Sequence, residues 1–380
     1  MIKLRHYSNL FIAPVFLLLA LTTQSTPTTA STAPIKINDA EDLGKIGRDR
    51  DYPLDGTYQQ TADIVVTKDY QSIGNDTHPF TGEYYGQCRS ISGLSNCFVD
   101  ILKGSISALH FARANIKNSA KPTGLAACVV DDTGTVSDIR AENVHVSTSG
   151  NNAHVGIGAG VVDGGGMVTN TMVVNSTVET SGRSAGAGIG GGQVDKAGTV
   201  ANTMAVNSHV TTSSYGSFAG IGGGWVEGTV ANTMAVNSHV TTRGLWAYAK
   251  HRGGGLVDDR GTVANTTAVN STVKTWGLHG NAGIGGGLVD DRGTVSNTTA
   301  VNSTVETKNM FGYAGIGGGD VLGTVANTTA LNSRVETVSW LADAGIGGGY
   351  VSGTVANTTA VNSRVKTSGK LARAGIGRGG

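Results

Sequence analysis

The sequence predicts an all-β fold: a right-handed parallel β-helix (β-solenoid) of about nine coils with a short N-terminal capping helix. Three observations predict this fold. Glycine accounts for 58 of the 380 residues and charged residues for 14%, while β-branched residues, which are poor helix formers, are abundant. A unit of about 31 residues repeats over residues 96–380. Within the unit, apolar and polar residues alternate with the period of a β-strand.

A representative unit reads GTVANTTAVNSTVKT, then six variable residues, then AGIGGGLVDDR. TVANTTAV and STVKT alternate in the manner of strands, and AGIGGGLV is short and apolar, which predicts three strands and three corners in each coil. One unit cannot bury its inner face alone, so neighbouring coils must stack in register. The glycine that opens the unit recurs at Gly134, Gly166, Gly198, Gly228, Gly261, Gly293, Gly323 and Gly353.

Positions that stay constant between units predict the register. Two apolar columns are expected to fill the core. The first is Val146, Val178, Val210, Val240, Val273, Val305, Val335 and Val365, and the second is Ile157, Ile189, Ile221, Ile284, Ile316, Ile346 and Ile376. Two asparagine columns are expected to hydrogen-bond from coil to coil and to satisfy the backbone at corners. They begin at Asn170 and Asn143 and recur in each following unit.

The N-terminus has the pattern of a secretion signal over residues 1–30. Lys3 and Arg5 precede an apolar run of twelve residues, Leu10 to Leu21, which is too short for a membrane span of about 20 residues. Residues 31–95 are expected to form an N-terminal cap and lead-in strands. There, Asn38-Asp-Ala-Glu41 predicts a capping box that opens a short helix ending at Ile46. The mature chain is therefore predicted to be secreted or displayed at the cell surface, with no transmembrane segment.

The lead-in segment contains an extended Tyr58-to-Ile64 stretch, the run FTGEYYG at residues 80–86, and Ile91-Ser-Gly-Leu94. This series, with the repeated GGGLVDDRGTV pattern, resembles bacterial GLUG-motif surface proteins. The resemblance covers nearly the whole mature chain and implies a right-handed β-helix on a bacterial surface, adhesin-like or part of a larger secreted peptidase. In that family the run at residues 80–86 forms a turn between two strands.

The three cysteines lie before the most regular repeats. Aligning NCFVD at residues 96–100 with ACVVD at residues 127–131 places Cys97 and Cys128 one coil apart, within reach of a disulfide. That pairing is favoured, and Cys88 bonded to Cys97 across a short loop is the alternative. Because the number of cysteines is odd, one thiol remains free.

Signatures of catalysis are lacking. The sequence has no HExxH, GxSxG, CxxC or P-loop, so no catalytic residue, metal ligand or cofactor is predicted. The calcium nonapeptide also fails, because Leu288 stands at the fourth position, where the motif requires glycine. A net charge of +1 argues against nucleic acid as a partner.

The six-residue window between STVKT and AGIG varies most and holds most aromatic residues of the repeats. Stacking would align these rings along one edge of the solenoid, where they suit sugars or protein partners; alternatively, they fold down and cover that edge. In one unit, Lys250-His251-Arg252 replaces Gly-Ile-Gly, which is either a local binding spot or a decayed repeat. The candidate binding residues are Tyr215, Phe218, Trp246, Tyr248, Lys250, His251, Arg252, Trp276, Phe311, Tyr313 and Trp340.

The function predicted from these features is non-enzymatic adhesion, through the variable edge, to a carbohydrate or to a host or matrix protein. A carbohydrate-active β-helix enzyme is the alternative, but it needs carboxylates clustered on one face. Ice binding is a third possibility. Ice binding requires a flat face of Thr-x-Thr motifs. The threonine column beside the variable window instead recurs as Val-x-Thr, next to a charge-bearing position. The C-terminal coil has no closing helix, which predicts either a truncated reading frame or a solenoid whose open end associates end to end with another chain.

Overall fold

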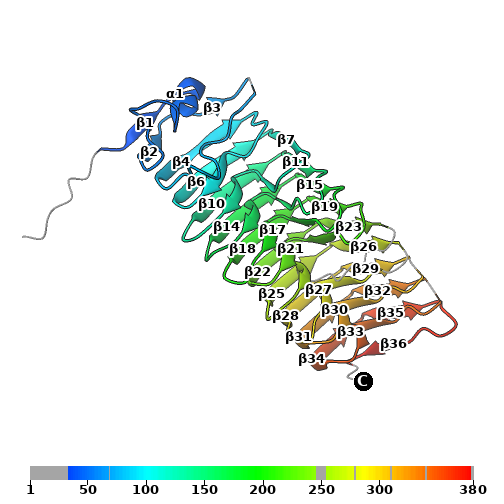
Figure 1. Cartoon of the computed structure of the whole chain (residues 1–380). Helices are drawn as coiled ribbons and strands as arrows, with labels where there is room; N and C mark the ends of the chain where they lie inside the picture. Colours follow the sequence, from blue (N-terminus) through cyan, green and yellow to red (C-terminus); the bar gives the residue numbers. More distant parts are fainter. Residues whose placement is uncertain are drawn as a thin grey trace, which may run out of the picture. The chain divides into compact units, whose positions relative to one another are not determined.

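A computed structural model describes residues 33–67, 69–244, 254–277, 280–308, 310–338 and 340–377. From Pro34 onward they belong to one unit. It is an all-β parallel solenoid of about ten turns with almost no helix, as the sequence predicts (Figure 1). Every strand pairing in the described chain is parallel. Equivalent residues of successive coils face each other, as Val305 faces Val335. The strands form four sheets, called here sheets 1 to 4.

Sheets 1 and 2 contain the two alternating runs of the repeat. Sheet 1 contains β1 (Ile35–Ile37), β2 (Thr57–Gln60), β3 (Ile64–Val65), β4 (Glu83–Ser92), β6 (Ser105–Ala112), β10 (Thr135–Glu142), β14 (Met167–Val174), β18 (Thr199–Val206), β22 (Thr229–Val236), β25 (Thr262–Val269), β28 (Thr294–Val301), β31 (Thr324–Leu331) and β34 (Thr354–Val361). Sheet 2 contains β7 (Asn115–Asn118), β11 (His145–Thr148), β15 (Thr177–Thr180), β19 (His209–Thr212), β23 (His239–Arg243), β26 (Thr272–Trp276), β29 (Thr304–Thr307), β32 (Arg334–Thr337) and β35 (Arg364–Thr367).

The glycine-rich run forms the remaining side. Sheet 3 contains β8 (Thr123–Gly124), β12 (Val155–Gly156), β16 (Gly186–Gly188) and β20 (Phe218–Gly220). Sheet 4 contains β5 (Val99–Leu102), β9 (Ala127–Val130), β13 (Ala159–Val162), β17 (Gly191–Val194), β21 (Gly223–Val226), β24 (Gly254–Val257), β27 (Ala282–Val289), β30 (Ala314–Val321), β33 (Ala344–Val351) and β36 (Ala374–Ile376). The prediction of one strand here is thus wrong for the early coils, where the run is split in two. In the later coils it is one strand bent at a glycine such as Gly317, whose φ is +101°.

The two predicted apolar columns do fill the core. Val146, Val305 and Ile316 are fully buried, and Val240 and Val273 are half-buried. Ile376 is 53% exposed and is the exception. Residues on the other face of the same strands point outward, so each strand buries one side only, as its period-2 pattern requires.

The first asparagine column forms a continuous ladder on the surface. Each Nδ2 donates to the Oδ1 of the preceding coil, as from Asn297 to Asn265 (2.9 Å) and from Asn327 to Asn297 (2.9 Å). Every member is left-handed, with φ of +53° at Asn297, so the column also turns the chain. In the second column the backbone N–H of Asn302 donates to the carbonyl of Leu331 in the next coil (3.0 Å). Both columns are structural, as predicted.

We expect Asn297→Ala to lower the free energy of unfolding by about 2–3 kcal/mol, because it removes two ladder hydrogen bonds and places alanine at a left-handed φ that asparagine tolerates better. Asn297→Gly should lose about half as much, since glycine accepts that φ. Urea denaturation, with hydrogen exchange in β28 and β31, measures both. Equal losses for the two variants would show that the backbone conformation contributes nothing.

A buried serine column, which the sequence reasoning missed, closes the corner after the second asparagine. The Oγ of Ser208 accepts from the backbone N–H of Ser176 (3.2 Å) and donates to the carbonyl of Val206 (2.9 Å). The same pattern recurs at Ser238, Ser271, Ser303 and Ser333. This column joins successive coils where no strand pairing is present.

The N-terminal segment corrects two predictions. The helix α1 (Ala40–Lys45) begins one residue later than predicted, because Asp39 and not Asn38 is its N-cap and accepts from the backbone N–H groups of Glu41 and Asp42 (2.9 Å each). The run at residues 80–86 is not a turn between strands. Instead β4 passes through Gly86 and shifts register between Tyr85 and Arg89, in a bulge.

Candidate binding groove

The predicted aromatic residues do not form one exposed ridge. Tyr215 and Trp340 are 41% and 58% exposed, whereas Phe218 is 7% exposed and packs on Trp225, with ring centroids 5.5 Å apart. Tyr313 is half-buried and stacks on Tyr350 (5.0 Å). Phe311 and Trp276 are also half-buried. Trp246, Tyr248, Lys250, His251 and Arg252 lie outside the described residues.

These positions divide the rings into two groups. Phe218 and Tyr313 turn down onto outward residues of sheet 4, which is the covering role considered as the alternative. Tyr215 and Trp276 lie at the end of sheet 2 where its strands pass into the variable window. The rings that remain at the surface of sheet 2 are therefore those of Tyr215 and Trp276, and the candidate site is the surface beside them.

That surface is a groove of about 510 Å³ along the outer side of sheet 2. Its lining comes from five successive coils, β7, β11, β15, β19 and β23. At a strand spacing of about 4.8 Å, it extends for roughly 19 Å. The lining residues are Lys117, Asn118, Ser147, Thr148, Ser149, Glu179, Thr180, Ser181, Thr211, Ser213 and Arg243.

Strand register explains how these side chains meet. Lys117, Ser147, Glu179 and Thr211 occupy one outward position in adjacent strands and face each other across the sheet. The first residue of each variable window supplies a second, parallel row. That row is Ser149, Ser181, Ser213 and Arg243. The groove is thus lined by hydroxyl groups, with a cation at each end.

Electrostatic pairing differs along the face. In the later coils each acid meets bases from its own or a neighbouring coil: Lys274 and Lys308 lie 3.2 and 3.0 Å from Glu306. In the groove, Glu179 is the one acid, and its carboxylate lies 3.0 Å from Nε2 of His145. No carboxylate of the described chain lies within ion-pair distance of Lys117 or Arg243.

The aromatic rings of the second group stack on cations beside the groove. The guanidinium of Arg183 lies 4.9 Å from the ring centre of Tyr215, and that of Arg243 lies 4.5 Å from the ring centre of Trp276. Arg243 and Trp276 are register partners in β23 and β26. A flat ring holds the planar guanidinium in place without neutralising it. Next to the groove, His209 and His239 stack at 4.9 Å, and burial, with His209 and Lys274 nearby, lowers the pKa of His239.

The sequence reasoning included Tyr215 and Trp276 but missed Lys117, Glu179, Arg243 and the serine row. The signal available was the first position of each variable window, which is Ser in three coils and then Arg and Trp. This position was grouped with the rest of the window instead of with the strand before it. The observed end of sheet 2 is what shows that this position belongs with the strand and not with the window.

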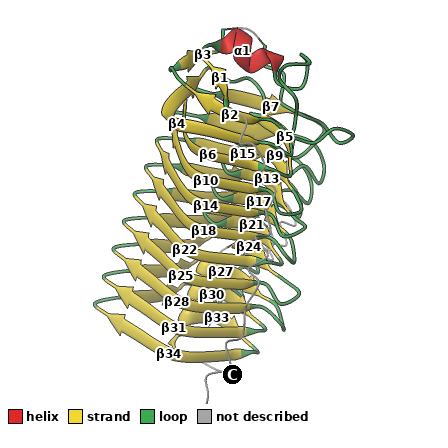
Figure 2. Cartoon of the chain, turned by 90° about the vertical axis from the view of Figure 1, so that its left-hand side faces the viewer, coloured by secondary structure: helices red, strands yellow, loops and turns green. Residues whose placement is uncertain are grey.

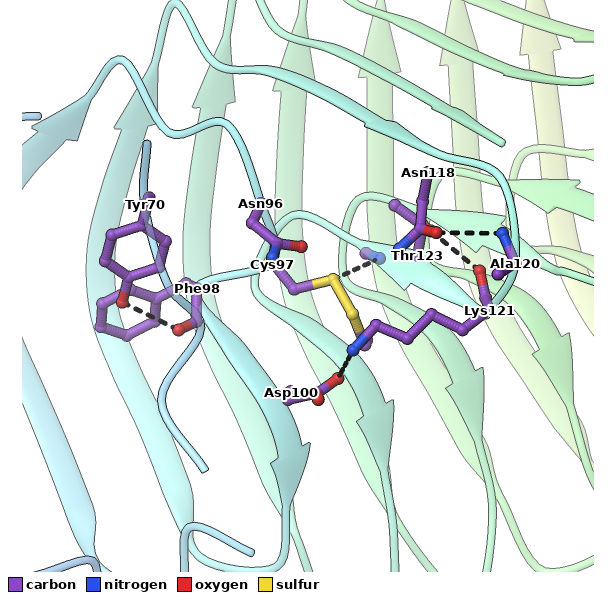
Figure 3. Close-up of a disulfide and its surroundings, with 11 residues drawn as sticks. Tyr70, Asn96, Cys97, Phe98, Asp100, Asn118, Ala120, Lys121 and Thr123 are labelled. Atoms are coloured by element: carbon purple, nitrogen blue, oxygen red, sulfur yellow. Dashed lines mark hydrogen bonds and ion pairs between the residues drawn. A yellow bond between two sulfur atoms is a disulfide. The ribbon is translucent and has the colours of Figure 1, made fainter. Parts of the chain in front are cut away.

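The first coils beside Lys117 are joined covalently. Cys97 and Cys128 form a disulfide with an S–S distance of 1.97 Å and a Cα–Cα distance of 5.6 Å (Figure 3). Cys88 is free and exposed. The pairing is the one favoured from the sequence, but the register is not. Asp100 lies opposite Cys128, since Val99 pairs with Ala127, three residues from the expected alignment.

A second, smaller cavity of about 60 Å³ lies inside the solenoid between Ile221 and Ile284. The cavity is far smaller than an ordinary ligand site. Elsewhere in the described chain, no group of three or more His, Cys, Asp or Glu residues is placed to hold a metal ion. None of the helices that the structure describes is long and apolar enough to span a membrane.

The fold and the groove define a parallel β-solenoid with a lateral polar groove. No family model matches the sequence, and no curated protein matches it. Among solved structures, the chain is similar to the "crystal structure of a putative immunoglobulin A1 protease from Bacteroides ovatus", with 17% identity and a TM-score of 0.42 over 88% of this chain and 84% of that one. A similarity this distant transfers neither an activity nor a partner to this chain.

Proposed function

We propose that the chain is an exported, non-enzymatic β-solenoid that binds an extended, negatively charged polysaccharide in the groove along sheet 2. The observation that carries this proposal is the pair Lys117 and Arg243, which face a hydroxyl-lined groove and have no carboxylate of the described residues within ion-pair distance. Serine and threonine hydroxyls match the hydroxyls of a sugar chain. Carboxylate or sulfate groups on that chain would pair with the two cations.

A hydrolase is favoured less by this geometry. Glycoside hydrolysis uses two carboxyl groups on opposite sides of the scissile bond, roughly 5–10 Å apart. The groove offers Glu179, whose carboxylate lies beside His145. Adhesion needs only retention of the polymer, and export follows from the signal pattern over residues 1–30. The ligand would then be a surface or matrix polysaccharide outside the cell.

We expect Lys117→Ala/Arg243→Ala to weaken binding of a uronate or sulfated polysaccharide by about tenfold or more, since a hydrogen bond to a charged group contributes about 1.5 kcal/mol. A glycan array followed by titration calorimetry measures the loss. Raising the salt concentration should also weaken polysaccharide binding by the wild-type protein, because salt screens the two charges.

The matched control is Arg364→Ala/Lys366→Ala, which removes the same charge from the far end of sheet 2 and should leave the affinity unchanged. Trp340→Ala tests the wider aromatic edge and should also have no effect, because Trp340 does not line the groove. Equal losses from the two charge variants would indicate non-specific attraction and refute the groove. A loss of affinity in Trp340→Ala alone would show that the binding site lies at the loop edge.

A further inference from the structure

A second outward face repeats regularly on sheet 1, between the two asparagine columns. In each coil, four residues point outward there: an asparagine, a methionine or threonine, a valine or leucine, and the second asparagine. We call this the inter-corner face. From the coil of Asn265 onward its middle residues are Thr267 and Val269, Thr299 and Val301, Thr329 and Leu331, and Thr359 and Val361. Figure 2 shows the strands of sheet 1 with no loop crossing in front of their middle.

The inter-corner face carries no charge. From Asn170 to Asn362, seven described coils place only Asn, Met, Thr, Val or Leu in its four columns. The coil before them places Arg140 and Glu142 in the same columns, with their charged groups 3.2 Å apart. Sheet 2, by contrast, carries charges as far as Lys366. The inter-corner face therefore differs from its surroundings in composition.

The inter-corner face is also held rigidly and periodically. Along one border each asparagine Nδ2 donates to the preceding Oδ1 at 2.8 to 3.0 Å. Each amide has a second N–H, which the ladder leaves available for a partner outside. Along the other border the backbone of the asparagine is bonded to the next coil, as Asn270 is to Val301 (2.9 Å). Methyl, hydroxyl and amide groups thus recur at the strand spacing of about 4.8 Å over roughly 29 Å.

Its size and composition argue against three other occupants. The face measures roughly 500 Å², less than the approximately 800 Å² per partner of a stable protein interface, so a second copy is disfavoured. The four columns contain no aromatic ring to stack on sugars, so a crystalline polysaccharide is disfavoured. They contain no cation for an anionic membrane. What remains is a partner that is itself uncharged, rigid and periodic.

We propose that the inter-corner face binds ice. Water next to apolar groups loses orientational freedom, and evenly spaced methyl groups order it in a regular array. Threonine hydroxyls and asparagine amides in the same rows can hydrogen-bond that array and join it to a growing crystal. The Val-x-Thr column beside the variable window, which includes Thr275 and Thr307, is not part of this face. Those side chains face inward, with exposures of 2% and 0%.

Ice-affinity partitioning of the full chain tests the proposal. The protein is frozen slowly from dilute solution, and its fraction in the ice is compared with that of an inert protein of similar size. Thr299→Lys/Thr329→Lys places two charges on the face at outward positions, where the fold can accommodate them. Thr304→Lys places a charge on sheet 2 and serves as the matched control. Circular dichroism confirms that all variants are folded.

We expect the wild-type chain and Thr304→Lys to be enriched in the ice and Thr299→Lys/Thr329→Lys to be excluded to the level of the inert protein. Exclusion of the wild-type chain, or retention of the double variant in the ice, would overturn the proposal. So would sedimentation of the wild-type chain with crystalline cellulose or chitin that the double variant abolishes. Because the groove lies on sheet 2, polysaccharide binding by the double variant should be unchanged, so the two proposals can fail separately.

Discussion

Gly315→Ala is expected to destabilise the later coils by about 3 kcal/mol. A β-carbon at Gly315 would lie 1.7 Å from the carbonyl oxygen of Gly318, because β30 bends back at Gly317. The clash is with backbone, so no side-chain rotation relieves it. The same approach recurs between Gly283 and Gly286 in the preceding coil, at 1.7 Å. This glycine is therefore a requirement of the bend in every late coil.

Urea denaturation and hydrogen exchange in β30 and β33 measure this loss. In a solenoid each coil contacts only its neighbours, so the effect should be greatest in those two strands. Gly44→Ala is the control. It lies in α1 with no atom within 4 Å of an added β-carbon, and alanine should stabilise that helix by about 0.5–1 kcal/mol. Unchanged protection in β30 of Gly315→Ala would show that the bend does not need glycine.

Cys97→Ser/Cys128→Ser is expected to cost roughly 3–4 kcal/mol in the first coils, because the disulfide closes a loop with a sequence separation of 31 residues. Both cysteines are buried, so each serine also leaves a polar group in the core. Loss of order should spread to β7, which carries Lys117 at one end of the groove.

Thermal unfolding with and without reductant measures how much the disulfide stabilises the first coils. Cys88→Ser removes the exposed, free thiol and should leave the melting temperature unchanged. Thiol titration of the unreduced, unfolded wild-type chain should find one reactive group. Three reactive groups, or a double variant as stable as the wild-type protein, would contradict the disulfide.

Periodicity made most of the fold predictable. Strand type, the valine and isoleucine columns and the asparagine ladders all follow from positions that stay constant from unit to unit. The periodicity does not predict where the chain bends. AGIGGGLV reads as one strand, but its early copies split, and only the close contact of Gly315 with Gly318 explains the later bend. In the first coil, the alignment of VD motifs misled because the turn after Leu102 is short.

The candidate site was harder to predict, because it consists of side chains from different coils. Lys117 and Arg243 are 126 positions apart in the sequence and are joined only by five stacked strands. The sequence shows the aromatic residues as a set, but Phe218 folds down onto sheet 4 and Tyr215 stays 41% exposed, although they share one window. That difference depends on what lies beneath each ring, namely Trp225 under Phe218 and Arg183 under Tyr215.

Affinity measured against the length of an anionic oligosaccharide tests the central claim most directly. The groove runs from Lys117 to Arg243 over roughly 19 Å, so the account predicts that affinity rises with length until a chain spans both cations and then levels off. In Lys117→Ala/Arg243→Ala the rise should disappear. An affinity that is independent of length, or equal affinity for the neutral oligosaccharide of the same length, would contradict a polysaccharide held along sheet 2.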